Sequence, residues 1–393
     1  MAMKNPTPKN TLTFSYDNRL LGEFQGAKSS PTVVIIAGIH GNETAGVLAA
    51  DKVLDKIKAD NVAFDGNLYF ILGNINALNK GVRFENVDLN RIWRKESIDG
   101  LLSIQEEPMA EVREQMDIYA LIKMILAKEN GPFYFLDLHT TSADSVPFIT
   151  ISDSLNNRKF SSNFPIPVVL GIEEYLDGPL LTFINEFGHV ALGFEGGAHN
   201  DPASVASCEA FIWKALVRSG CLQKSEVVDF EKYRMILSDL CCEYQFFAIN
   251  YRYPLENGEN FKMLSGFKNF EPIEKGQLLA NSDGNEIRAH ESGRIFMPLY
   301  QELGEDGFFV LHKISKFWLK ASIVARKLKI NHFLRLIPGV RQDPGNNFTL
   351  IVNPKIARFM AKEIFHLFGY RQQIYKDDKL HFIKRDRKIS ELQ

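Results

Sequence analysis

Residues 33–46 read VVIIAGIHGNETAG, a short apolar run followed by a glycine-containing turn and the start of a helix-forming segment. The run VVIIA has the length and composition of a strand buried on both faces. The segment from Thr44 to Lys58 then carries apolar residues at three- and four-residue spacing, which predicts a helix packed against that strand. A strand that leads directly into a helix is the repeating unit of α/β folds, so this stretch predicts an α/β protein.

The same alternation continues to about residue 220. A second segment of helical periodicity spans Met109 to Lys128, and four more apolar runs have the length of buried strands. These runs are Leu68–Leu72, Phe133–Leu138, Pro147–Ile151 and Val190–Phe194. We therefore expect a mixed, mostly parallel sheet with helices on both of its faces.

After about residue 230 the pattern changes to alternating segments broken by Gly and Asn, such as EYQFFAINYRY at residues 243–253. These segments predict a small antiparallel β domain. Further along, FTLIV, a helical stretch from Pro354 to Phe368 and the runs QQIY and KLHFI predict an appended α+β extension. The expected division of the chain is therefore residues 1–230, 231–312 and 313–393.

Residues 313–335, at the start of the extension, hold seven basic residues and no acid, with apolar residues at helical spacing between them. One interpretation is an interfacial helix on an anionic membrane. We favour the other, a helix that packs its apolar stripe on the domain while its lysines stay solvated. The expected stripe consists of Phe317, Leu319, Ile323 and Leu328.

Composition excludes several classes of partner. Lysine and arginine number 46 against 48 acids, a formal net charge of −2, so the chain has no overall basic character of the kind that nucleic acid attracts. The first residues lack an apolar core of signal-peptide length, and no uncharged apolar stretch is long enough to span a bilayer. We expect a cytoplasmic protein with no nucleic-acid or membrane partner. The four cysteines, at positions 208, 221, 241 and 242, form no CxxC pair and are expected to pack as free thiols.

Two histidines and a glutamate at strand ends predict a metal site. His40 and Glu43 share one strand-to-helix turn, and His139 follows the predicted strand FYFLDL in the same way. Open α/β sheets bind ligands at this edge, and two imidazoles with one carboxylate leave a fourth position on zinc open for water. The sequence therefore predicts a catalytic site for one Zn²⁺ ion. The alternative is a polar turn beside a hydrogen-bonded loop histidine.

Other residues suit amide hydrolysis beside such a metal. Asn90 and Arg91, in ENVDLNRIW, could hold a substrate carboxylate through a bidentate contact. Arg83 could stabilise the oxyanion that forms on the attacked carbonyl, and Glu195 could carry a proton from water to the leaving nitrogen.

Two further polar residues lie close to these motifs. Asp137 is two positions before His139 and could orient its ring, but we expect it to be a buried structural carboxylate. We expect His199 to cap the helix that follows it.

In order and spacing, these motifs resemble the succinylglutamate desuccinylase and aspartoacylase family of zinc enzymes, which are related to zinc carboxypeptidases. That family's pattern of HGNE, arginine, DLNR, DLH and EGG occurs here at residues 40–43, 83, 88–91, 137–139 and 195–197. The resemblance covers about residues 30–220 and, more loosely, the β domain to about residue 310. It implies a carboxypeptidase-like catalytic domain with zinc on His40, Glu43 and His139. It also implies that Glu195 is the general base and acid, that Arg83 polarises the carbonyl, and that Asn90 with Arg91 binds substrate.

The resemblance implies zinc-dependent hydrolysis of the amide bond of an N-acyl amino acid or a similar small carboxylate, with a water on the metal as nucleophile. Aspartoacylases grip a second carboxylate with a tyrosine and an arginine about ten to fourteen positions before the catalytic glutamate. The corresponding stretch here, LLTFINEFG at residues 180–188, has neither, so acetyl-aspartate is not the expected substrate. A zinc carboxypeptidase acting on peptides and a catalytically silent small-acid-binding protein remain alternatives. The sequence does not set the oligomeric state, and a homo-oligomer stays open.

Overall fold

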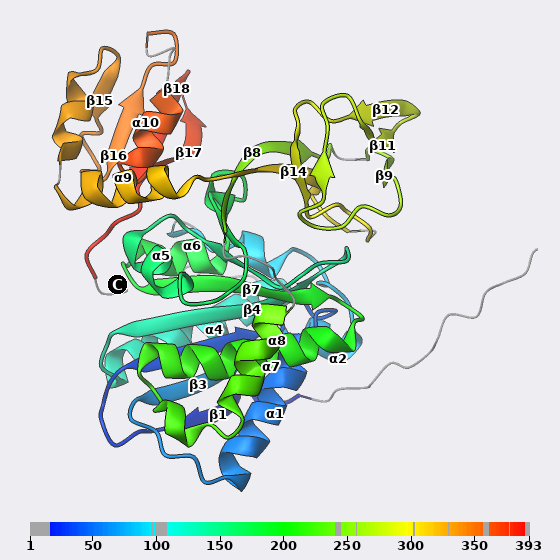
Figure 1. The fold of residues 1–393 in the computed structure, drawn as a ribbon, viewed down its shortest axis with the longest axis vertical. Coiled ribbons are helices and arrows are strands. Elements are labelled where there is room, and N and C mark those ends of the chain that lie inside the picture. Colours follow the sequence, from blue (N-terminus) through cyan, green and yellow to red (C-terminus); the bar gives the residue numbers. More distant parts are fainter. Residues whose placement is uncertain are drawn as a thin grey trace, which may run out of the picture.

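The computed structural model describes residues 16–95, 98, 108–239, 245–256, 258–301, 303–328, 330–356, 361–376 and 378–389. Within these residues an 11-stranded mixed sheet runs through the centre of the molecule (Figure 1), in the order β1-β3-β2-β4-β7-β5-β6-β8-β14-β13-β10. Its strands are β1 (Leu20–Phe24), β2 (Thr32–Ala37), β3 (Asn67–Leu72), β4 (Phe133–Thr141), β5 (Phe148–Ile151), β6 (Val168–Leu170), β7 (Val190–Ala198), β8 (Phe246–Pro254), β10 (Pro272–Ile273), β13 (Gly293–Phe296) and β14 (Asp306–Lys313).

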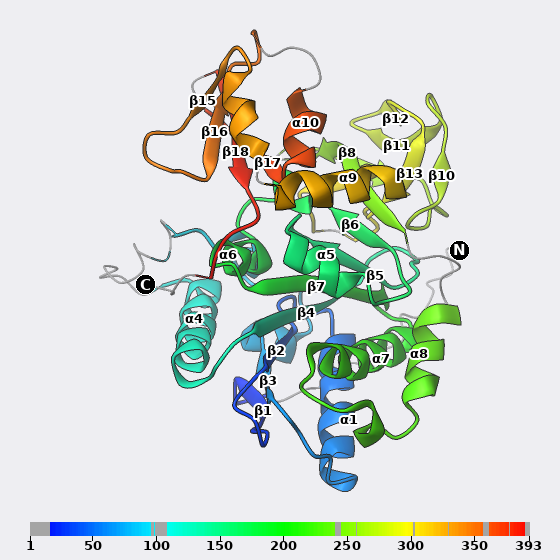
Figure 2. The same ribbon diagram turned by 60° about the vertical axis from the view of Figure 1, so that its left-hand side comes forward.

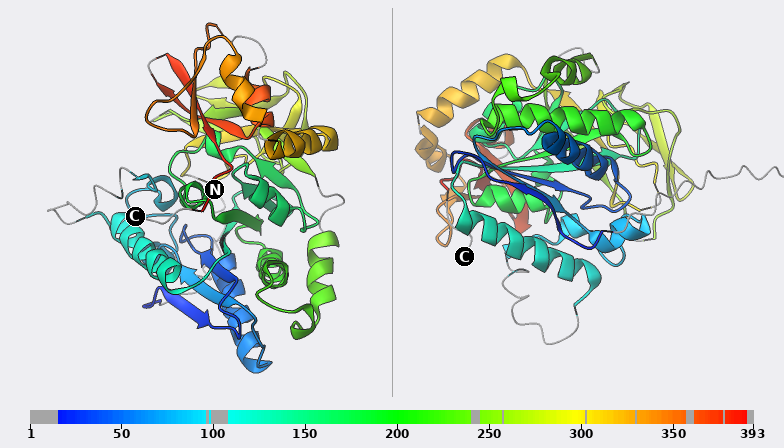
Figure 3. Two further views of the ribbon diagram at one scale, coloured as in Figure 1. Left: turned by 90° about the vertical axis from the view of Figure 1, so that its left-hand side faces the viewer. Right: turned by 90° about the horizontal axis from the view of Figure 1, so that it is seen from below.

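Helices cover both faces of this sheet. Alternate residues of β2 point to opposite sides: Val33 packs in the core that contains α1 and α7, whereas Val34 packs in the core that contains α4 and α6. Figure 3 shows α1 and α7 on one side of the strands and α4 on the other. The helices are α1 (Ala45–Ala59), α2 (Ile75–Lys80), α4 (Ala110–Lys128), α5 (Leu155–Ser161), α6 (Leu180–Glu186), α7 (Pro202–Ser219) and α8 (Phe230–Asp239).

The predicted α/β class is confirmed. Strands β3, β2, β4 and β7 are mutually parallel, so their carboxyl ends meet at one edge of the sheet, and β5 pairs antiparallel with β7. All five strands predicted in the first half exist, as do both helices. Strands β1 and β6 were not predicted, and β6 is only three residues long.

The expected antiparallel strands of the later half also exist, but they continue the large sheet. Strand β8 pairs parallel with β6 and antiparallel with β14, so the first two predicted domains share one sheet. A second, three-stranded sheet consists of β9 (Phe261–Met263), β11 (Leu278–Ser282) and β12 (Asn285–Arg288). The domain boundaries at residues 230 and 312 stay a prediction.

The C-terminal extension has its own sheet and core, built around Phe365 and Phe382. Figure 2 shows α9 running below this sheet, close to α5. The elements of the extension are α9 (Lys316–Lys327), β15 (Val340–Gln342), β16 (Thr349–Val352), α10 (Ala361–Leu367), β17 (Tyr370–Lys376) and β18 (Lys379–Lys384). No helix in the described part of the chain is both long enough and apolar enough to cross a membrane.

The expected packing of α9 is wrong for two of its four apolar residues. Phe317 is 69% exposed and Leu328 is 64% exposed. The helix instead buries Ser322, Ala325 and Arg326, because the guanidinium of Arg326 reaches into an ion cluster below it.

That cluster centres on Asp153, which lies just beyond β5 and is fully buried. Its Oδ2 accepts hydrogen bonds from Nη2 of Arg158, Arg326 and Arg371, at 2.9, 3.0 and 2.7 Å. Burial alone would raise the pKa of Asp153, but the three guanidinium groups outweigh it and hold the pKa well below its usual value. We call this group the Asp153 cluster; it joins the extension to the large sheet.

The prediction of free, packed thiols is confirmed for the two cysteines that the structure describes. Cys208 and Cys221 are buried free thiols, and Cys241 and Cys242 lie outside the described residues.

Candidate active site

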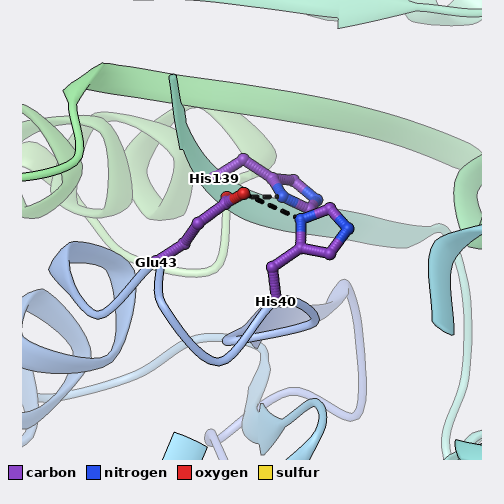
Figure 4. A group of neighbouring side chains, drawn as sticks. All are labelled: His40, Glu43 and His139. Atoms are coloured by element: carbon purple, nitrogen blue, oxygen red, sulfur yellow. Dashed lines mark hydrogen bonds and ion pairs between the residues drawn. The ribbon is translucent and has the colours of Figure 1, made fainter. Parts of the chain in front are cut away.

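The predicted metal ligands converge at the carboxyl edge of the sheet (Figure 4). His40 and Glu43 lie in the turn between β2 and α1, and His139 lies near the end of β4. Glu43 bridges the two rings: its Oε1 is 2.8 Å from His40 Nδ1 and its Oε2 is 3.0 Å from His139 Nδ1. All three side chains are buried, and one potential ligand atom from each lies within 4.8 Å of the others.

The local backbone explains this convergence. Gly38 has a φ of +76°, which L side chains rarely adopt, and it lets the chain leave β2 in the tight turn that carries His40. The backbone N–H of Thr140 donates to Glu43 Oε2 at 3.0 Å, which ties the turn to the end of the neighbouring strand β4.

A second carboxylate holds each ring from behind. His40 Nε2 lies 3.0 Å from Asp88 Oδ1, and His139 Nε2 lies 2.8 Å from Asp137 Oδ2. This is the arrangement in which a carboxylate fixes the protonated nitrogen of a ligand histidine and turns its other nitrogen towards a metal. Asp137 therefore contacts the His139 ring, which was the less favoured of the two interpretations of its sequence position. The contact between Asp88 and His40 was not predicted.

The charges of Glu43 and His139 stabilise each other. Burial would raise the pKa of Glu43, but the two histidines outweigh it and hold that pKa well below its usual value. Burial would lower the pKa of His139, but Asp137 and Glu43 outweigh it and raise that pKa well above the usual value. An ionised carboxylate between two imidazoles is a donor set that suits zinc.

Glu195 lies on β7, directly opposite His139 in the parallel register. Its side chain is buried, and its Oε2 has no hydrogen-bond partner in the described part of the chain. Burial raises the pKa of Glu195 to about 8, although the neighbouring His139 opposes the shift. A carboxyl group with such a pKa can give and accept a proton near neutral pH.

Arg83 lies between the metal-ligand group and the segment that follows. Its Nη1 donates to Glu43 Oε1 at 3.3 Å and its Nη2 donates to Asp88 Oδ2 at 3.0 Å. Its Nε is buried without a partner among the described residues.

Asn90 and Arg91 belong to a short 3-10 helix, Leu89–Arg91, which begins where Asp88 accepts a hydrogen bond from the backbone N–H of Asn90. The side-chain oxygen of Asn90 accepts from the N–H of Leu180, so this segment lies against the start of α6. Arg91 Nε is 3.5 Å from Glu305 Oε2.

All seven predicted site residues line one cavity of about 600 Å³, and His199 lines it too. The expectation that His199 caps α7 is wrong, because Asp201 accepts the capping hydrogen bond from the N–H of Ala203. His199 Nδ1 is instead 2.7 Å from Thr140 Oγ1, and its Nε2 is 3.3 Å from Gln301 Oε1.

The rest of the cavity is lined mainly by apolar side chains from α6, the loop before it, β7 and β14. We call this part the apolar arm. It is formed by Ile172, Leu176, Pro179, Leu181, Ala191 and Phe309.

The fold and the site define an α/β protein with a buried, metal-competent His–Glu–His group at the carboxyl edge of its sheet. Residues 29–203 match the model of the family described as "Succinylglutamate desuccinylase/Aspartoacylase catalytic domain". This match covers 175 of the 393 residues and agrees with the resemblance that the motifs predicted.

Curated relatives agree with this family. A succinylglutamate desuccinylase from Chromobacterium violaceum is 38% identical over 127 residues, which cover 32% of this chain and 35% of the relative. One from Pseudoalteromonas atlantica is 24% identical over 281 residues, which cover 68% and 76% of the two chains. The more similar match thus spans about a third of that relative's length.

Solved structures share the fold. A succinylglutamate desuccinylase/aspartoacylase from Rhodobacter sphaeroides aligns with a TM-score of 0.56 and 14% identity over 75% of this chain and 88% of the other. The product-bound ectoine utilization protein EutE (DoeB) from Ruegeria pomeroyi aligns with a TM-score of 0.54 and 19% identity over the same shares.

Proposed function

We propose that this protein is a zinc-dependent deacylase that hydrolyses the amide bond of an N-acyl amino acid or a similar small carboxylate. The observation that carries the proposal is the buried His40–Glu43–His139 group, which lies within a catalytic domain of a deacylase family. Hydrolase activity in general is supported by the match of residues 29–203 to this family.

Nδ1 of His40, Nδ1 of His139 and the Glu43 carboxylate would hold one Zn²⁺ ion, with Asp88 and Asp137 keeping the two rings in place. When bound, zinc lowers the pKa of a water towards about 7 and polarises a carbonyl oxygen.

Glu195 would carry the proton. Its unpartnered Oε2 takes a proton from the attacking water and then delivers it to the nitrogen of the scissile amide. The carbon–nitrogen bond then breaks, and the products are a carboxylate and a free amine.

The arginines would position the substrate. Arg83 stabilises the negative charge that develops on the carbonyl oxygen, since its guanidinium already lies beside Glu43. Arg91, with Asn90, binds the substrate carboxylate. Its present ion partner, Glu305, has a side chain that is 63% exposed and contributes little, so a substrate carboxylate can replace it.

A zinc carboxypeptidase would use the same residues, and the cavity favours the smaller substrate. The loop between β13 and β14 lines it with Leu299, Leu303 and Glu305, and the cavity volume of about 600 Å³ is in the range of small-molecule sites. A silent binding protein is disfavoured because every residue required for the reaction lines the cavity.

The test combines metal content with turnover. We expect one zinc per chain, loss of amine release from N-acyl amino acids after chelation, and recovery on adding Zn²⁺. Glu195→Gln should keep the zinc but lose about 10²- to 10⁴-fold in turnover, whereas Glu256→Gln, at an exposed position, should match the wild type. Unchanged turnover by the metal-free protein would overturn the proposal, and cleavage of peptides alone would favour the carboxypeptidase.

A further inference from the structure

The apolar arm begins at Glu195 and follows β7 away from the metal-ligand group. Residues 191, 193 and 195 lie on one face of this strand, since alternate residues of a strand point the same way. Ala191 and Gly193 are small, so this face of the strand is closely approached by side chains of neighbouring elements. A side chain at position 193 would collide with Thr150 Oγ1 and would lie 3.3 Å from Leu181 Cδ1, so Leu181 covers the strand next to Glu195.

The walls of the arm are apolar and partly uncovered. Ile172 and Leu176 pack on the buried cluster that contains Phe309, and all three line the cavity. Ile172, Leu176 and Leu181 are only half-buried in the protein, so part of each side chain remains for a ligand to cover.

The charged residues that line the cavity also favour an uncharged group in the apolar arm. Five carboxylates but only two arginines line the described part of the cavity, with no lysine among them. Arg83 already contacts Glu43 and Asp88, which leaves Arg91 as the cation available to a substrate carboxylate. A second carboxylate placed in the apolar arm would lose its water without gaining a cation, which is unfavourable.

The apolar arm and Arg91 both lie where the amine half of the substrate would bind. Glu195 delivers a proton to the leaving nitrogen in the proposed reaction, so the amine half lies next to the arm. The Asn90–Arg91 segment adjoins α6 through the hydrogen bond from the Leu180 N–H to the Asn90 side chain. The group held by Arg91 and the group in the arm therefore both belong to the amine.

We propose that the amine product is an amino acid with an apolar side chain, of the size of leucine, methionine or phenylalanine. Its carboxylate binds Arg91 and its side chain fills the apolar arm. This inference rests on the proposed deacylase function and specifies its substrate class.

The wild-type, zinc-loaded protein tests this directly. The panel comprises N-acetyl and N-succinyl derivatives of L-leucine, L-phenylalanine, L-aspartate and L-glutamate, each read by amine release. Within each acyl series we expect kcat/KM for the leucine and phenylalanine compounds to exceed that for the acidic ones by at least about tenfold. Calorimetry gives a readout without turnover: Glu195→Gln should bind free L-leucine or L-phenylalanine at least about tenfold more tightly than L-aspartate.

Variants of the arm sharpen the test. Leu181→Arg places a cation in the arm and should lower kcat/KM for the leucine compound by at least about tenfold while raising it for the aspartate compound. Leu328→Arg, the same substitution at a 64% exposed position that does not line the cavity, should stay within about threefold of the wild type. Leu176→Arg provides an independent variant of the same design, and thermal unfolding of each protein checks that it folds.

The outcomes separate the two proposals. Preference for the acidic compounds would overturn the apolar-arm inference and leave the deacylase function standing. If no compound releases amine, the deacylase function fails, and calorimetry then decides the inference. Tight binding of L-leucine or L-phenylalanine would support it, and equal or weaker binding than L-aspartate would overturn it.

Discussion

His139 Nε2 lies 2.8 Å from Asp137 Oδ2, and the two residues share one face of β4 because they are two positions apart on a strand. His40 Nε2 has the equivalent contact with Asp88. Both rings are therefore oriented before any metal binds, with each Nδ1 towards Glu43. Such pre-orientation reduces the cost of assembling a metal site.

Asp137→Asn should weaken zinc binding by about 10- to 100-fold, because an amide no longer holds the proton on His139 Nε2 with a full negative charge. Competition with a zinc-binding dye measures the affinity. Asp144→Asn is the control, since Asp144 forms an exposed ion pair with Lys268 away from the site. An unchanged zinc affinity in Asp137→Asn would show that this contact does not support the metal.

Arg91→Lys should raise KM for N-acyl amino acids by about tenfold or more with a smaller effect on kcat, because an ammonium cannot make the bidentate contact with the substrate carboxylate. Glu305→Gln should lower KM by up to about fivefold, since it removes a competing carboxylate from Arg91. Steady-state kinetics on both variants check this pair. A loss confined to kcat in Arg91→Lys would contradict a role in binding.

His189 should make the protein less stable in acid. Burial lowers the pKa of His189 to about 4, below its ordinary value of 6.5, so the folded state prefers the neutral ring. The stabilisation from this preference is complete above about pH 6.5 and is lost as the pH falls towards 4. Between pH 7 and pH 5 the free energy of unfolding should fall by about 2 kcal/mol on account of this residue.

Urea unfolding at the two pH values measures this loss. His189→Phe should remove most of it, since a phenylalanine keeps the ring contacts with Phe133 and Phe135 without a titrating group. His332→Gln, at an exposed position, should behave as the wild type. Equal pH dependence in wild type and His189→Phe would assign the acid sensitivity to other groups.

Asp153→Asn should lower the free energy of unfolding by about 3–5 kcal/mol, because it leaves three buried guanidinium groups without their shared carboxylate. Denaturant titration measures the change. Glu186→Gln, which removes a partly exposed ion pair 4.0 Å long with Arg387, should cost less than about 1 kcal/mol. A small effect of Asp153→Asn would mean that the Asp153 cluster contributes little to stability.

The sequence predicted which residues lie together at this edge of the sheet, because they are tied to strand ends. His40, His139 and Glu195 each follow or end an apolar run, and parallel strands bring such ends together whatever lies between them. The apolar character of LLTFINEFG was also visible, but its place in the cavity depends on how α6 packs.

Contacts between residues far apart in the chain could not be predicted from the sequence, because they depend on tertiary packing. Asp88 meets His40 across 48 residues, and only the geometry of the short 3-10 helix brings them together. The apolar periodicity of α9 predicted its buried face only in part, because a polar residue, Arg326, has a partner 173 residues earlier in Asp153. A periodic pattern reports which residues are apolar, and a distant charge can still decide which side turns inward.

The Asp153 cluster has a consequence for how the protein is made. Asp153 is synthesised long before two of its partners, since Arg326 and Arg371 follow it by 173 and 218 residues. Until both Arg326 and Arg371 have been synthesised, the carboxylate has only Arg158 beside it and cannot be buried at low cost. The part of the nascent chain around β5 and α5 therefore reaches its final packing only after Arg371 has been synthesised. Strand β17 thus supplies a buried partner to a sheet whose first strand, β1, lies more than three hundred residues earlier.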